Sequence, residues 1–132
     1  MSGTVLVVED DANLRYFVST VLRGAGFDPV SAVRAEDALS LLDGVPCDLA
    51  VMDVRLPGMS GMNALGEISR RRPDLPVVIM TACDAVTETS ALERGATSFL
   101  RKPFSAEQLL DGVRKALACG GTKGASPRKA VR

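Results

Sequence analysis

The stretch that decides the fold of this chain is Leu49-Ala50-Val51-Met52-Asp53-Val54-Arg55-Leu56-Pro57-Gly58-Met59-Ser60-Gly61. Its apolar run has no helical spacing and ends in one carboxylate, which is typical of a strand buried on both faces. Pro57-Gly58 suits the central positions of a type II turn, because proline presets its φ and glycine accepts a positive one. We therefore expect Asp53 at the C-terminal end of a central parallel strand, the edge where open α/β sheets bind ligands.

On both sides of this stretch, strand patterns alternate with helix patterns. Runs of β-branched and apolar residues predict strands over 4–8, 28–32, 48–52, 76–80 and 98–101. Apolar spacing and capping signals predict helices over 14–22, 35–42, 62–72 and 105–117, and a weaker one with few apolar positions over 84–94. Parallel strands need crossover connections, so this alternation predicts a parallel sheet with helices on both faces.

Length and composition narrow the classes of protein and of function to which the chain can belong. The chain has 132 residues, 46% of them hydrophobic, which suits one domain with a proper core. Four of its 16 basic residues follow residue 119 and none of its 16 acidic residues does, so the remainder is mildly acidic, which argues against direct nucleic-acid binding. Three cysteines without metal spacing and no histidine argue against zinc or Cys-His chemistry. With no apolar run of membrane-spanning length, we expect a cytoplasmic protein without membrane contact.

Polar residues follow four of the predicted strands. Glu9-Asp10-Asp11, Asp53, Thr81 and Lys102 should meet at one edge of a parallel sheet. Two carboxylates ~4 Å apart repel by about 4 kcal/mol at an effective dielectric near 20, so several stay ionised together only beside cations. Mg²⁺ prefers such oxygen ligands, and Lys102 adds a positive charge. An ionised aspartate in this setting is a candidate nucleophile toward phosphorus.

Five short segments carry a joint pattern. They are Val7-Val8-Glu9-Asp10-Asp11, the stretch from Met52 to Gly61, Met80-Thr81-Ala82, Gly95-Ala96 and Lys102-Pro103-Phe104. With them, the chain resembles the receiver domains of two-component response regulators over about residues 3–118. The resemblance implies a flavodoxin-like, doubly wound five-stranded parallel sheet of order 2-1-3-4-5 with five helices. It also implies a receiver domain over 3–119, followed by a flexible tail or linker over 120–132.

The resemblance assigns roles to individual residues. Asp53 matches the phosphoacceptor, Thr81 the switch hydroxyl, Lys102 the phosphate-contacting lysine and Phe99 the aromatic switch position. The implied Mg²⁺ ligands are Asp10, Asp53 and the backbone carbonyl of Arg55, with Glu9 acting through water. The bond between Lys102 and Pro103 matches one that is usually cis in the family. Relatives tune dephosphorylation at the positions of Arg55 and Cys83.

The implied function is phosphoacceptor signalling. A sensor histidine kinase or phosphotransfer protein would dock on the first helix and phosphorylate Asp53 with Mg²⁺. Tyr16 on this helix is either part of the docking surface or merely packed on it. The surface over 84–118 would then change to control an output such as transcription. One expected partner is a second copy of the chain, in a homodimer that depends on phosphorylation. Such a domain promotes its own phosphotransfer and slow autodephosphorylation but is not otherwise an enzyme.

Three other functions remain to be compared with this one. A stand-alone phosphorelay shuttle would have the same site and no attached effector. A phosphohydrolase of the haloacid dehalogenase type would need a second acid two residues after its nucleophile, where this chain has Arg55. A flavodoxin-like cofactor binder would need a phosphate-binding loop after the first strand, where this chain has three acids.

Overall fold

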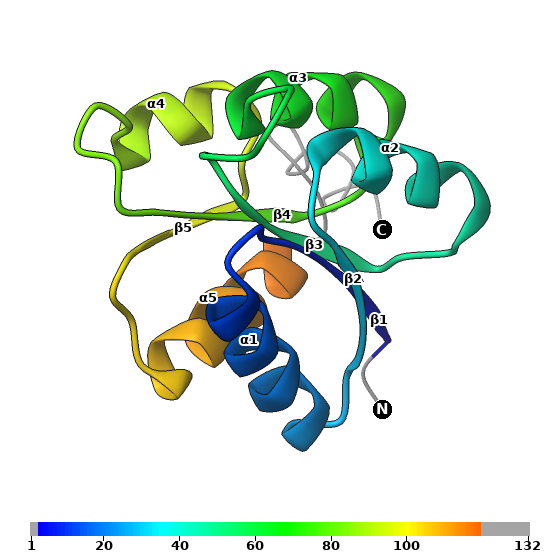
Figure 1. Cartoon of the computed structure of the whole chain (residues 1–132), viewed down its shortest axis with the longest axis vertical. Helices are drawn as coiled ribbons and strands as arrows, with labels where there is room; N and C mark the ends of the chain where they lie inside the picture. The colour runs from blue at the N-terminus through cyan, green and yellow to red at the C-terminus, as the bar shows by residue number, and fades with distance from the viewer. Residues whose placement is uncertain (1–2, 120–132) are drawn as a thin grey trace.

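Within residues 3–119, five strands and five helices alternate. The structure is a computed structural model that describes residues 3–119 (Figure 1). The predicted tail over 120–132 lies outside the described residues. The elements are β1 (Thr4–Val8), α1 (Ala12–Gly24), β2 (Asp28–Ala32), α2 (Ala35–Gly44), β3 (Leu49–Asp53), α3 (Gly61–Arg71), β4 (Val77–Thr81), α4 (Glu88–Glu93), β5 (Ser98–Arg101) and α5 (Ala106–Cys119).

The strands form one parallel sheet in the order β2-β1-β3-β4-β5, which confirms the predicted fold class and strand order. Helices α1 and α5 cover one face of the sheet, and α2, α3 and α4 cover the other (Figure 1). The order reverses between β1 and β3, so the C-terminal ends of these two strands flank the position at which such folds form a crevice. Asp53, the last residue of β3, lies at this position.

The core consists of two apolar layers that share the central strands. Alternate residues of β3 point to opposite faces: Leu49 and Val51 pack with α1 and α5, and Ala50 and Met52 pack in the layer under α2 and α3. All five residues of β3 are buried, which explains why its sequence is apolar without alternation. The sheet therefore holds the backbone of Asp53 in a fixed position.

The connection after β3 has the positive glycine φ that its sequence predicts, within a bend over residues 57–59. Gly58 has a φ of 80°, the positive value that the second central residue of a type II turn requires. Ser60 then caps α3, since its hydroxyl accepts a hydrogen bond from the Asn63 N–H at 3.2 Å. At Gly61 a Cβ atom would lie 2.2 Å from the Asp53 carbonyl oxygen, so only glycine lets α3 begin this close to β3.

Helix α4 is shorter than predicted. The sequence pattern suggested 84–94, whereas the helix spans only Glu88–Glu93. Its start is fixed by Thr87 and Ser90, whose side chains each accept the backbone N–H of the other in a capping box. The residues before Thr87 are held as a loop by hydrogen bonds from Arg101 to the carbonyls of Cys83 and Val86.

Other boundaries differ slightly from the predictions. β3 and β4 each begin and end one residue later than expected, so Asp53 and Thr81 are the last residues of their strands rather than the first beyond them. The cap of α5 is confirmed, with Ser105 and Gln108 exchanging hydrogen bonds at 2.8 and 3.1 Å. On α5, Leu109, Gly112, Val113 and Ala116 are buried, while Leu110 and Leu117 are only half-buried. Within residues 3–119, no helix combines the length and apolarity needed to cross a bilayer.

Candidate functional site

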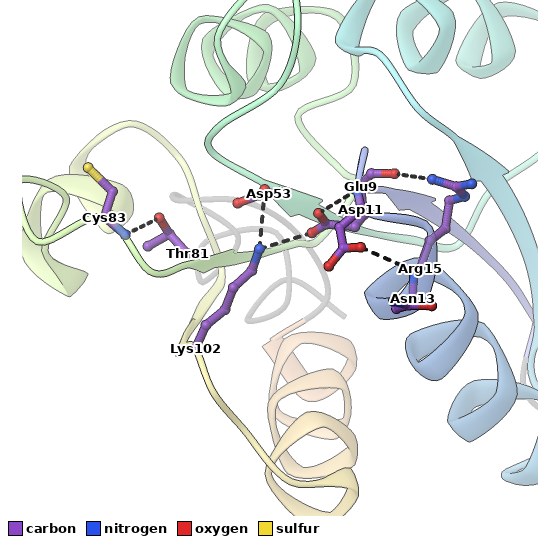
Figure 2. Close-up of polar contacts among 8 residues, drawn as sticks. All are labelled: Glu9, Asp11, Asn13, Arg15, Asp53, Thr81, Cys83 and Lys102. Atoms are coloured by element: carbon purple, nitrogen blue, oxygen red, sulfur yellow. Dashed lines mark hydrogen bonds and ion pairs between the residues drawn. The ribbon is translucent and has the colours of Figure 1, made fainter.

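The four strand ends bring the predicted residues together. Asp53 and Thr81 end β3 and β4, and Glu9 and Lys102 directly follow β1 and β5. Glu9 is 1% exposed, Asp53 4% and Thr81 not at all, whereas Asp10 is exposed. Figure 2 shows Lys102 reaching across from the end of β5 toward the carboxylates of Glu9 and Asp53. The four side chains therefore lie together at one edge of the sheet, as the sequence predicted.

Lys102 forms the centre of the site. Its Nζ atom lies 3.1 Å from Glu9 Oε1 and 3.2 Å from Asp53 Oδ2, so one ammonium group bridges both buried carboxylates. Burial acts to lower the pKa of Lys102, but the charges of Asp53 and Glu9 more than offset it and raise the pKa above its ordinary value. Lys102 is thus charged at neutral pH. The bond between Lys102 and Pro103 is cis, as expected.

Glu9 is held from three sides. Its carboxylate accepts the Asp11 N–H at 3.1 Å in addition to the Lys102 contact, and its carbonyl oxygen accepts a hydrogen bond from Arg15 at 2.8 Å. Burial raises the pKa of the Glu9 carboxyl, and the negative charge of Asp53 adds to this effect, against the opposing hydrogen bonds from Asp11 and Lys102. Two buried carboxyl groups thus share the single ammonium group of Lys102.

The acidic residues have the donor set of a hard-cation site. One carboxylate oxygen from each of Glu9, Asp10 and Asp53 lies within 4.8 Å of the others. Oxygen-only donors, two of them on buried residues and one exposed to solvent, fit a divalent ion that keeps some of its water. The third acid of the sequence cluster has another role, because Asp11 caps α1 by accepting the Asn13 N–H at 3.2 Å.

Thr81 is connected to the loop that follows it. Its Oγ1 atom accepts a hydrogen bond from the Cys83 N–H at 2.9 Å, which leaves the hydroxyl hydrogen for another acceptor (Figure 2). The Ala85 N–H lowers the pKa of the Cys83 thiol, and a hydrogen bond from Arg55 and its charge contribute to the same shift. Arg55 and Cys83, which the sequence placed near the site, thus contact each other.

Two contacts near the site were not predicted from the sequence. Arg101 binds the carbonyls of Cys83 and Val86 and lies over the Phe99 ring, with its Cζ atom 5.0 Å from the ring centroid. Glu36 at the start of α2 accepts the Met59 N–H at 3.2 Å, which ties α2 to the loop after Asp53. The i, i+2 spacing of Phe99 and Arg101 on a strand was a signal for the first contact, and no local signal existed for the second.

The fold and the strand-end site define a doubly wound α/β domain of the chemotaxis-regulator type. The sequence model described as the response regulator receiver domain matches residues 5–114. The chain therefore belongs to the receiver domain family of two-component response regulators.

Individual relatives agree with this assignment. The response regulator protein FleR of Pseudomonas aeruginosa is 44% identical over 114 residues, which make up 86% of this chain and 24% of FleR. The DNA-binding transcriptional regulator NtrC of Salmonella typhimurium is 36% identical over 117 residues, 88% of this chain and 25% of NtrC. The response regulator TrrA of Thermotoga maritima, solved with Mg²⁺ and BeF, has a TM-score of 0.80 at 28% identity, covering 88% of this chain and 99% of that one. The chain spans about a quarter of the length of these two curated relatives.

Proposed function

We propose that residues 3–119 act as a phosphoacceptor domain in which Asp53 receives a phosphoryl group from a phosphohistidine donor. The observation that carries this proposal is the Lys102 ammonium group, which lies 3.2 Å from Asp53 Oδ2 and 3.1 Å from Glu9 Oε1. An ionised carboxylate held beside a fixed cation at a strand end is prepared to attack phosphorus. Lys102 is also positioned to neutralise charge on the transferring oxygens.

In this reaction one Asp53 carboxylate oxygen forms a bond to phosphorus while the bond from phosphorus to the donor nitrogen breaks. The imidazole nitrogen keeps the electron pair and takes up a proton, and the product is an acyl phosphate on Asp53. Glu9, Asp10, Asp53 and the Arg55 carbonyl would hold Mg²⁺, with Glu9 acting through water. The bound ion would supply positive charge to the phosphoryl oxygens. Later attack by water on the acyl phosphate would return Asp53 to its free form.

The response would pass through Thr81 and Phe99. The free hydrogen of the Thr81 hydroxyl can be donated to a phosphoryl oxygen, and a phosphoryl group adds about −1.5 to −2 charge at neutral pH to attract it. Phe99 would turn into the space that Thr81 leaves. The surface over 84–118 would then change and control an output such as transcription, the process that the name of NtrC gives for that relative.

The donor would dock beside α1. Tyr16 is 73% exposed and Phe17 37% exposed, which leaves aromatic surface available for a partner on this helix. Phe17 also lines a groove together with Lys102, Pro103 and Phe104. A histidine kinase or phosphotransfer domain seated here would bring its phosphohistidine to the Lys102 side of the site. Phosphorylation-dependent homodimerisation is part of the same proposal.

The test is the intact mass after incubation with Mg²⁺ and acetyl phosphate, for the wild type and Asp53→Asn. The wild type should gain one phosphoryl group only when Mg²⁺ is present, and Asp53→Asn should gain none, because it lacks the nucleophilic oxygen. Equal gain in both proteins would contradict the assignment of Asp53. If neither gains mass, a histidine-phosphorylated donor protein replaces acetyl phosphate, and failure with that donor would contradict the function itself.

A further inference from the structure

The side chain of Arg101 joins three parts of the domain. One guanidinium nitrogen donates to the Cys83 carbonyl at 2.7 Å and another donates to the Val86 carbonyl at 2.7 Å. The guanidinium carbon lies 5.0 Å from the centroid of the Phe99 ring. One residue at the end of β5 therefore binds two carbonyls of the β4–α4 loop, and its guanidinium group lies over the aromatic ring of Phe99 on the same strand.

The sheet register places this arginine beside Thr81. Thr81 pairs with Arg101 and Ile79 pairs with Phe99 in the parallel β4–β5 ladder. Side chains alternate along each strand, so Thr81, Phe99 and Arg101 share one face of the sheet, while Leu100 packs on the other. The Cys83 N–H binds Thr81 Oγ1 at 2.9 Å and the Cys83 carbonyl binds Arg101. A continuous set of contacts thus runs from Thr81 through the backbone of Cys83 and the guanidinium group to Phe99.

We propose that Arg101 is a positioning residue that holds the loop of residues 83–86 in the arrangement of the unphosphorylated domain and thereby sets how readily Thr81 leaves it. The inference rests on the proposed function, since Thr81 has to reach the phosphoryl group. To do so, Thr81 must either give up the Cys83 N–H or carry the loop with it. Two charge-assisted hydrogen bonds from Arg101 oppose movement of the loop, which leaves Thr81 to break its contact with the Cys83 N–H.

A planar guanidinium group is required for this role. It offers donors in a fixed fork, so it binds two carbonyls at once and still stacks on a ring, whereas a lysine ammonium group has no such plane. Arg101 is exposed, so truncating it leaves no cavity in the core. The variant Arg101→Ala should therefore remain folded while the loop is released.

The experiment compares the wild type with Arg101→Ala, Arg101→Lys and Arg114→Ala. Arg114 is exposed on α5, which makes its substitution a control for the loss of one positive charge. Amide exchange over residues 82–87 is measured by NMR in the ligand-free proteins. Each protein is then titrated with beryllofluoride in the presence of Mg²⁺, and the concentration at half saturation is recorded. Thermal unfolding shows whether each variant is folded.

In Arg101→Ala we expect faster exchange confined to residues 82–87 and about a fivefold to tenfold lower half-saturating concentration of beryllofluoride, because the loop no longer has to be pulled free. The loop exchange and the half-saturating concentration of Arg101→Lys should lie between those of the wild type and Arg101→Ala, and Arg114→Ala should match the wild type. An Arg101→Ala protein with wild-type loop exchange and wild-type half saturation would overturn the inference. Uniformly faster exchange across the whole domain would also overturn it, because that result would mean that Arg101 stabilises the whole fold and not the loop in particular. A wild type that binds no beryllofluoride contradicts the proposed function instead, and the ligand-free exchange still decides the role of Arg101.

Discussion

Glu9 is an acid enclosed by protein next to a second acid, and its titration should affect folding. Burial and the charge of Asp53 raise its pKa above 4.5, the ordinary value. Between that ordinary value and the raised one, the folded state binds a proton that the unfolded state does not. The contribution of Glu9 to the free energy of unfolding therefore falls as the pH rises from 4.5 through the raised pKa. This contribution is regained as the pH falls back toward 4.5.

We therefore predict that, without Mg²⁺, the difference in melting temperature between the wild type and Glu9→Gln depends on pH. The wild type should gain stability relative to the variant as the pH is lowered from 7.5 to about 4.5, because protonation removes the buried charge that glutamine lacks throughout. Thermal unfolding followed by circular dichroism at several pH values measures this difference. The control is Glu93→Gln, which changes an exposed glutamate on α4. A pH-independent difference between the wild type and Glu9→Gln would contradict the raised pKa.

Among the elements, α3 shows how the site depends on the packing of a helix start. Gly61 and Gly66 lie in the same helix, yet their surroundings differ. A Cβ atom at Gly61 would meet the Asp53 carbonyl oxygen at 2.2 Å and the Val54 Cα atom at 2.6 Å, whereas nothing lies within 4 Å of a Cβ atom at Gly66. The first glycine is required by the close approach of β3, and the second is not.

The two alanine substitutions should therefore have opposite effects. Gly61→Ala should lower the free energy of unfolding by about 2 kcal/mol, because backbone atoms next to Asp53 must move to make room. Gly66→Ala should raise it by about 0.5–1 kcal/mol, because alanine loses less backbone entropy within a helix. Urea unfolding measures both values. Equal effects of the two substitutions would show that the contact at Gly61 relaxes without cost.

For the whole molecule, the two apolar layers share the central strands, so the domain should unfold as one unit. Leu65 belongs to the layer under α2 and α3, and Leu109 belongs to the layer under α1 and α5. Neither has any exposed surface. Because β1, β3 and β4 contribute residues to both layers, loss of either layer removes the support for the other.

We predict that Leu65→Ala and Leu109→Ala each lower the free energy of unfolding by about 2–5 kcal/mol, the usual cost of a cavity in a core. Each variant should still unfold in one transition with an unchanged dependence on urea. Leu92→Ala is the control, since Leu92 is 38% exposed, and should change stability by at most about 0.5 kcal/mol. Two separate transitions in either core variant would show that the layers are independent.

The sheet could be predicted from the sequence because its strands are buried on both faces. Residues 49–53 and 77–81 consist almost entirely of apolar residues, and their strands were placed to within one residue. The convergence of Glu9, Asp53, Thr81 and Lys102 followed from the parallel order alone, without any knowledge of side-chain contacts. Strand ends of a parallel sheet share one edge, so topology was sufficient here.

The start of α4 and the role of Arg101 could not be predicted in this way. The segment before Thr87 is a loop because Arg101 binds the Cys83 and Val86 carbonyls from 18 and 15 residues away along the chain. The i, i+2 spacing of Phe99 and Arg101 indicates only that the two side chains share one face of a strand, and it does not identify the loop carbonyls that Arg101 binds. The burial of Glu9 was hidden for a similar reason, because three consecutive acids look equally exposed in the sequence.

Besides the pairing of β4 with β5, the side chains of Thr81 and Arg101 are connected through the backbone of Cys83, whose N–H binds Thr81 and whose carbonyl binds Arg101. Such a connection does not depend on which side chain residue 83 carries. Selection can therefore change this side chain, which faces Arg55 in this protein, while the link between the two strands persists. Related domains can therefore differ in the side chain at this position, two residues after Thr81, and keep the same two backbone hydrogen bonds to Thr81 and Arg101.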